Sequence, residues 1–128
     1  MKSFIDKTIK PFLVIAGLFT CMGGIYGFLP IFAVENLSKL PFDENYIMFV
    51  QHWGSMVLLA GIFMIIAAFN VAWRLPILLF IIIEKVCFVI LYLFHACQQS
   101  GAGFKGAAIM DGIIVIYLLI YFLSLREK

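Results

Sequence analysis

The chain has 128 residues, of which 65% are hydrophobic and only 12% are charged. A soluble domain of this length could not bury so much apolar surface, so the composition excludes an ordinary water-soluble protein and indicates one membrane domain over 1–128. The formal net charge of +2 and the absence of a basic run in the sequence give no support to nucleic-acid binding.

Four apolar stretches are long enough to cross a bilayer as helices. We expect them to span residues 12–34, 47–69, 76–97 and 106–125. The connection at 70–76 is short, so the second and third spans should be antiparallel neighbours. The predicted fold class is therefore all-α, an antiparallel four-helix transmembrane bundle. A polar loop, 35–46, follows the first span and could form either a lid over the bundle or an interfacial turn.

The basic residues are distributed unevenly between the two ends of this bundle. One end would hold Lys2, Lys7, Lys10, Arg74, Arg126 and Lys128, and the other end only Lys39 and Lys105. Because loops on the cytoplasmic side are enriched in Lys and Arg, both termini are predicted to be cytoplasmic.

Several residues of the spans have recognisable helix-packing or boundary roles. Gly23 and Gly27 make a GxxxG step that would let another helix approach closely, although glycine is also common in lipid-facing helices. Trp73 and Arg74 fit an interfacial anchor, and Pro76 fits the first turn of the third span.

Glu84 and Lys85 lie near the middle of the third span, where a charge costs about 2.5–3.5 kcal/mol on insertion scales. Lys85 is expected to extend to the cytoplasmic interface, because helical side chains lean toward the helix N-terminus. Glu84 would then stay inside, with Thr20 and Tyr117 at its depth. It could transfer protons or hold a polar ligand group, or it could be a protonated acid that only locks the helices together.

A second polar layer is predicted nearer the outer surface. At a rise of about 1.5 Å per residue, His52, Tyr92 and Asp111 share one depth, with His95 slightly above, and Asp111 is about 12 Å shallower than Glu84. An Asp111–His52 pair is the natural arrangement. The two histidines also suggest a haem site, or a metal site with Asp111 as the third ligand. The alternative is that both histidines only make ordinary hydrogen bonds at the interface. No metal ligand is assigned and any cofactor is unknown.

Three short motifs resemble those of small bacterial four-helix membrane proteins of the DoxX-like superfamily. They are His52-Trp53-Gly54, Trp73-Arg74-x-Pro76 and Glu84-Lys85, and the resemblance extends from Gln51 to Tyr121. It implies a four-helix architecture in a bacterial inner membrane. DoxX itself is associated with thiosulfate:quinone oxidoreductase, but no catalytic residue of the family can be matched to a position of this chain.

The leading functional hypothesis is a membrane protein that binds a small lipophilic molecule, quinone- or lipid-like, at an interior polar site. The candidate ligand-binding residues are Glu84, Thr20, Tyr117, His52, Asp111, Tyr92 and His95. The alternative is a non-catalytic subunit or assembly factor that contacts a membrane-complex partner or a second copy of itself. A haem or metal redox protein is a weaker alternative. No catalytic motif is present in the sequence, so whether the protein is an enzyme stays open.

Overall fold

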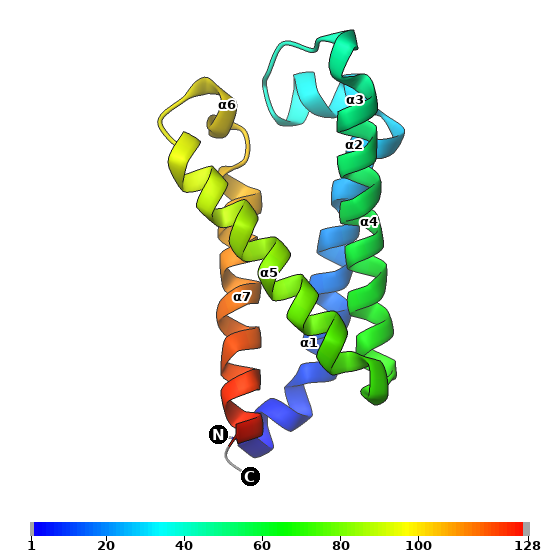
Figure 1. Cartoon of the computed structure of the whole chain (residues 1–128), viewed down its shortest axis with the longest axis vertical. Helices are drawn as coiled ribbons and strands as arrows, with labels where there is room; N and C mark the ends of the chain where they lie inside the picture. Colours follow the sequence, from blue (N-terminus) through cyan, green and yellow to red (C-terminus); the bar gives the residue numbers. More distant parts are fainter. Residues whose placement is uncertain (1, 127–128) are drawn as a thin grey trace.

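The computed structural model describes residues 2–126, which form helices and connections without any strand. Four helices are long: α1 (Lys2–Cys21), α4 (Ile47–Phe69), α5 (Val71–His95) and α7 (Lys105–Arg126). The start of α1 and the end of α7 lie together at one end of the molecule, which we call the terminal end (Figure 1). The predicted all-α four-helix bundle is confirmed.

Short elements form the opposite end, which we call the loop end (Figure 1). Between α1 and α4 the chain forms η1 (Met22–Gly24), α2 (Ile25–Phe28), α3 (Pro30–Phe32), the π-helical η2 (Ala33–Leu37) and η3 (Glu44–Tyr46). Between α5 and α7 it forms α6 (Gln99–Ala102). Of these, η1 and α2 continue the first span along α4 to Phe28, and η3 begins the second span, whereas α3, η2 and α6 belong to the connections.

The long helices are apolar on their outward faces as well as on the faces that pack together. Four segments are long and apolar enough to cross a membrane: Ser3–Phe28, Glu44–Phe69, Val71–His95 and Lys105–Arg126. On α5, for example, Phe80, Ile83 and Leu93 are 54%, 57% and 67% exposed. Such a surface is stable only against lipid, so the chain is a small integral membrane protein.

The predicted ends of the second and fourth spans agree closely with α4 and α7, but those of the first span are wrong. The helix begins at Lys2 rather than residue 12, and the span ends at Phe28, before the non-helical Leu29. Ile5, Ile9 and Leu13 are buried on one face at helical spacing. A search for continuous apolar sequence does not detect an amphipathic helical segment of this kind, because polar residues interrupt it.

The third span also begins earlier than predicted, at Val71, and α5 ends at His95 rather than residue 97. The Asn70 side chain accepts a hydrogen bond from the Trp73 backbone N–H at 3.3 Å and so caps the helix. Pro76 therefore lies inside α5 instead of in its first turn. Arg74 donates to the carbonyls of Ala67 and Ala68 at 2.8 and 3.0 Å, so it caps the end of α4.

Glycines allow α1 and α2 to pack directly on α4. A Cβ atom at Gly61 would overlap the carbonyl oxygen of Gly17, and one at Gly54 would overlap the backbone nitrogen of Gly27. Gly23 lies against Val57. The close approach expected of the GxxxG step is therefore made within the chain, to α4, rather than to a partner protein.

The bundle consists of two helix pairs, α1 with α4 and α5 with α7, which pack together most tightly at the terminal end. The buried core there comes from all four long helices and includes Leu13, Met64, Leu78, Ile81 and Leu118. Toward the loop end the two pairs diverge, and α5 runs obliquely across the bundle (Figure 1). The divergence leaves a cavity between them.

The polar loop that follows the first span lies over this cavity, so of the two predicted alternatives the lid is correct. The Tyr26 and Ser38 hydroxyl groups are hydrogen-bonded at 2.5 Å, and both residues are buried. The Ser38 carbonyl lies against Gly103 on the other connection, where a Cβ atom would overlap it. Leu37 lines the cavity.

Candidate functional site

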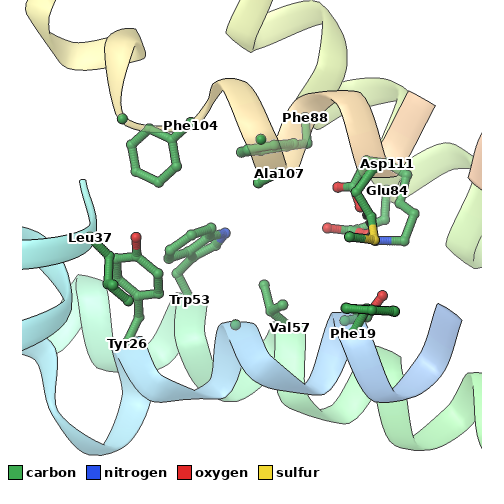
Figure 2. Close-up of a pocket in the computed structure, with 16 residues that line it drawn as sticks. Phe19, Tyr26, Leu37, Trp53, Val57, Glu84, Phe88, Phe104, Ala107 and Asp111 are labelled. Carbon is green, nitrogen blue, oxygen red and sulfur yellow. Dashed lines mark hydrogen bonds and ion pairs between the residues drawn. The ribbon is translucent and has the colours of Figure 1, made fainter. Parts of the chain in front are cut away.

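The cavity between the two helix pairs has a volume of about 220 Å³. Figure 2 shows its apolar walls, which come from both pairs and consist of Phe19, Val57, Phe88 and Ala107 toward the middle of the bundle and Tyr26, Trp53 and Phe104 toward the loop end. An engineered cavity of about 150 Å³ in a soluble protein binds benzene, so this one has room for a group the size of a single ring.

Four of the aromatic rings contact one another in sequence. Tyr26 and Trp53 meet edge to face at 4.8 Å between ring centroids, Trp53 and Phe104 at 6.0 Å, and Phe104 and Phe88 at 6.2 Å. Edge-to-face contacts of this kind are favourable and orient the rings. The part of the cavity nearer the loop end therefore has a continuous aromatic lining.

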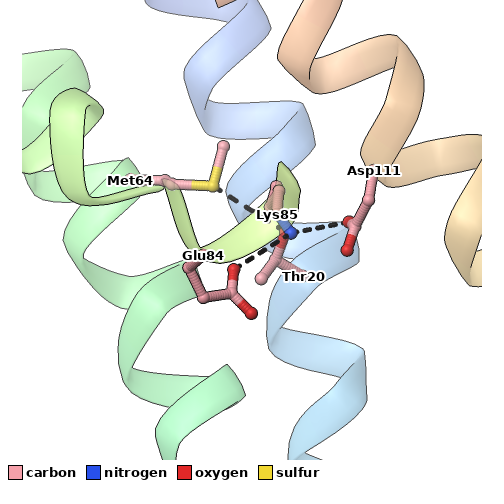
Figure 3. A network of polar contacts seen from close by, with 5 residues as sticks. All are labelled: Thr20, Met64, Glu84, Lys85 and Asp111. Atoms are coloured by element: carbon pink, nitrogen blue, oxygen red, sulfur yellow. Dashed lines mark hydrogen bonds and ion pairs between the residues drawn. The ribbon is translucent and has the colours of Figure 1, made fainter. Parts of the chain in front are cut away.

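The inner end of the cavity is charged. The Lys85 ammonium donates a hydrogen bond to Asp111 Oδ1 at 2.6 Å, and its distance to Glu84 Oε2 is 3.9 Å (Figure 3). The Lys85 side chain is only 3% exposed, and those of Glu84 and Asp111 are 30% and 16% exposed. Two helices thus bring one cation and two carboxylates together inside the membrane-spanning region.

This cluster retains unused hydrogen-bonding capacity. Glu84 Oε2 is buried and accepts no hydrogen bond within the described part of the chain. An ammonium has three N–H donors, and the hydrogen bond to Asp111 uses one of those on Lys85. The cluster can therefore accept a hydrogen bond from a guest at Glu84 and donate one at Lys85.

Two of the predictions for this region are wrong. Lys85 does not extend to an interface but is buried against Asp111, and Asp111 lies beside the Glu84–Lys85 pair rather than about 12 Å above it. The depth count assumed helices that run parallel to one another from equal starting levels. The oblique path of α5 and the actual ends of the helices remove that difference (Figure 1).

Thr20 and Tyr117, the predicted partners of Glu84, have different positions. Thr20 lines the cavity with Glu84, but its hydroxyl lies 3.8 Å from the Met64 sulfur instead (Figure 3). Tyr117 follows Asp111 by six residues on α7, toward the terminal end. Its hydroxyl bonds to that of Thr8 at 2.6 Å, and its ring stacks on Phe12 at 3.7 Å. The structure therefore does not bring Tyr117 to the cavity.

The predicted pair of His52 and Asp111 does not form. Adjacent helical residues point about 100° apart, and because Trp53 faces the cavity, His52 faces outward and is exposed. Tyr92 and His95 line a second, mostly apolar cavity beside α6, which Phe88 and Phe104 separate from the first. His95 is exposed, and its Nδ1 lies 2.8 Å from Gln98 Oε1.

Over residues 2–126, no group of three His, Cys, Asp or Glu side chains is close enough to share a metal ion. His52, His95 and Asp111, the trio that the sequence suggested, are thus not brought together. The three cysteines, Cys21, Cys87 and Cys97, are all free.

The sequence interpretation missed the role of Lys85 and of the aromatic lining. A signal for them does exist at helical spacing. Phe88 follows Lys85 by three residues on α5, and Ala107 and Asp111 lie four residues apart on α7, with Phe104 in the turn just before that helix. Lys85 therefore shares a helix face with the aromatic Phe88, and Asp111 shares one with Ala107, which indicates a mixed polar and apolar surface.

Comparisons with protein-family models, with curated proteins and with solved structures found no match for this chain.

Proposed function

We propose that this integral membrane protein binds a small lipophilic molecule, quinone- or lipid-like, in the cavity at Lys85 and Asp111. The observation that carries the proposal is the buried charged cluster at the inner end of an aromatic cavity. Burying ionisable groups in a membrane span is costly, so such groups usually serve a site or a pathway. A few polar groups beneath apolar and aromatic walls are also typical of small-molecule sites.

The hydrogen-bonding groups that remain free define the ligand's head group. A carbonyl oxygen would accept a bond from Lys85, and a hydroxyl would donate one to Glu84 Oε2. A quinone or quinol ring offers these groups, as does a hydroxyl-bearing lipid head. The aromatic side chains would pack against a ring.

The charge of the cluster and the volume of the cavity restrict the ligand's head group further. The cluster already holds two carboxylates against one ammonium, so an anionic head group would add a further repulsion. A cavity of about 220 Å³ is also small for the head of a two-chain phospholipid. We therefore expect a neutral head no larger than a ring.

The proposal can be tested with tryptophan fluorescence, because the chain has two tryptophans and only Trp53 lines the cavity. In a Trp73→Phe background, an alkyl-benzoquinone should quench Trp53 saturably. Native mass spectrometry of the detergent-extracted protein should show one bound alkyl-benzoquinone or long-chain fatty alcohol. Glu84→Gln should weaken binding of the fatty alcohol by about tenfold, because its hydroxyl then bonds to a neutral acceptor instead of a carboxylate. Asp111→Asn should weaken binding of the quinone by a similar factor, because Lys85 loses the carboxylate that positions its ammonium.

The matched control is Asp43→Asn, since Asp43 is exposed in the lid loop and its side chain accepts hydrogen bonds from Asn45, away from the cavity. Binding in this variant should equal that of the unsubstituted protein. If neither probe binds saturably, or if Glu84→Gln and Asp111→Asn bind both probes normally, the interior polar site is not a binding site.

The resemblance to the DoxX-like superfamily stays a prediction, as do the bacterial inner membrane and the cytoplasmic termini. The orientation is supported by the positions of Lys7, Lys10, Arg74 and Arg126 at the terminal end, against Lys39 and Lys105 at the loop end. Lys128, also assigned to the cytoplasmic side, lies outside the described residues.

A further inference from the structure

An apolar groove runs between α1 and α7 on the lipid-facing side of the bundle. These two helices contact each other at the terminal end, where Thr8 and Phe12 meet Tyr117, and separate toward the loop end (Figure 1). The groove has a volume of about 300 Å³. Every residue along it is apolar or glycine, including Ile15, Ile109 and Ile113, and these three isoleucines are more than half exposed.

The groove is continuous with the charged cavity. Phe19 of α1 and Gly106 and Met110 of α7 line both of them. Met110 also lines the cavity together with Asp111, so the groove opens beside the charged cluster. Gly106 has no neighbouring heavy atom within 4 Å of the position that a Cβ atom would occupy, so the junction is open at this point.

At the loop end, by contrast, access is narrowed. The lid is held by the Tyr26–Ser38 hydrogen bond, and Ser38 packs against Gly103 on the facing connection. Together with the rings of Trp53 and Phe104, these contacts cover the side of the cavity nearest the water. The junction at Gly106 opens onto the lipid-facing groove.

We propose that the space between α1 and α7 is a lateral portal through which a single-chain amphiphile enters from the bilayer, leaving its hydrocarbon chain in the groove. This inference rests on the proposed function, because the head group would be the one held at Lys85 and Asp111. The cavity and the groove match the head group and the hydrocarbon chain of such a molecule. The charged cavity has room for a head group the size of one ring, and the groove that connects it to the membrane has only apolar surface.

The chain contributes to affinity through the apolar contacts that it makes with the groove. Each methylene of the chain that the groove covers adds to affinity, so blocking a length of about two methylenes would weaken binding by about tenfold or more. A two-chain lipid would not fit in the same way, because one groove reaches the cavity through this junction. A neutral single-chain molecule is therefore the class of ligand that we assign.

The open space at Gly106 provides a sharp test. Gly106→Phe adds a ring at the junction, from a Cβ position that has no neighbour within 4 Å, and Gly106→Leu is a smaller plug for use if the first variant fails to fold. Gly112→Phe is the matched control, since Gly112 lies on the same helix, also has open space around it, and lines neither the cavity nor the groove. All variants carry Trp73→Phe and are reconstituted in nanodiscs.

Binding is measured by quenching of Trp53 with an alkyl-benzoquinone and by native mass spectrometry with a long-chain fatty alcohol. Both Gly106 variants should bind at least about tenfold more weakly than the parent, and Gly112→Phe should bind as the parent does. The fold of each variant is checked by its unfolding transition.

Each result has a definite meaning. If the Gly106 variants bind as tightly as the parent while Asp111→Asn still binds weakly, the binding site stands and the portal is wrong. Equal losses at Gly106 and Gly112 would likewise overturn the portal, since the effect would not depend on the junction. If the parent binds neither probe, the proposed function fails, and the portal fails with it.

Discussion

At the residue scale, the bundle is distinguished by an ion pair formed in an apolar surrounding. The Lys85 ammonium and the Asp111 carboxylate are 2.6 Å apart on neighbouring helices, and Glu84 lies 3.9 Å away on the other side of the ammonium. Desolvating such groups is expensive, so the pair is tolerated only because each charge has an opposite partner. Its stability depends on the integrity of the whole cluster.

Removing one partner should therefore be costly. We expect Asp111→Asn to lower the free energy of unfolding by about 3 kcal/mol, because the buried ammonium loses its closest carboxylate. Lys85→Met in the same chain should restore part of this loss, since the buried ammonium is removed and only the partly exposed Glu84 stays without a cation. Reversible unfolding in mixed micelles would measure both. Additive losses in the double variant would show that the two side chains are not energetically coupled.

At the element scale, the packing of α1 and α2 on α4 depends on glycine at the points of closest approach. Gly54 contacts the backbone at Gly27, and Gly61 contacts that at Gly17. In lipid, helices associate through such close packing rather than through the hydrophobic effect. The glycines therefore set the distance between the two helices, and with it the position of Trp53 in the cavity wall.

Adding one methyl group at these contacts should separate the helices. Gly54→Ala is expected to destabilise the protein by about 1–3 kcal/mol, because the new Cβ atom would overlap the backbone at Gly27. Gly112→Ala is the control, since its Cβ atom meets open space and alanine favours helix. Unfolding transitions of the two variants would be compared. An unchanged Gly54→Ala transition would mean that α2 and α4 do not touch at this point.

The lid depends on one buried hydrogen bond. Tyr26→Phe removes the hydroxyl that pairs with Ser38 at 2.5 Å, and we expect a loss of about 1 kcal/mol together with faster hydrogen exchange in 33–40. Tyr46→Phe is the matched control, because Tyr46 is 59% exposed and its hydroxyl makes no hydrogen bond in the described part of the chain. Equal exchange in the two variants would show that the Tyr26–Ser38 bond does not hold the lid.

At the scale of the whole molecule, the four helices place the two termini at one end and the lid at the other (Figure 1). If the terminal end is cytoplasmic, as its basic residues predict, the lid and the connection after α5 face the outside. The cavity proposed to bind the ligand then lies in the outer half of the membrane, between helix pairs that pack together at the inner side.

Cysteine labelling can establish this orientation. With Cys21 and Cys87 replaced by alanine, the exposed Cys97 at the loop end should react with a membrane-impermeant maleimide in intact cells. A Ser3→Cys variant without the native cysteines should react only after the cells are opened, because Ser3 is exposed at the terminal end. The opposite pattern would place the termini outside.

The residues that could be predicted from sequence are those whose roles follow from local rules. The ends of α4 and α7 were predicted within a residue because an unbroken apolar run determines them. Glu84 and Asp111 were predicted to face the interior of the bundle because exposing a charged side chain to lipid costs free energy. The start of α1 was missed, since its core-facing residues alternate with lysines and an aspartate.

The sequence by itself determined that this chain is a four-helix membrane protein with ionisable groups inside the bundle, because composition and apolar run length decide where a chain can be dissolved. Only the tertiary structure decided which of those groups meet. The oblique path of α5 placed Lys85 beside Asp111 and left His52, His95 and Tyr117 elsewhere. Helix tilt and rotation arise from packing between helices, such as that at Gly54 and Gly61. They cannot be derived by counting residues along a single helix.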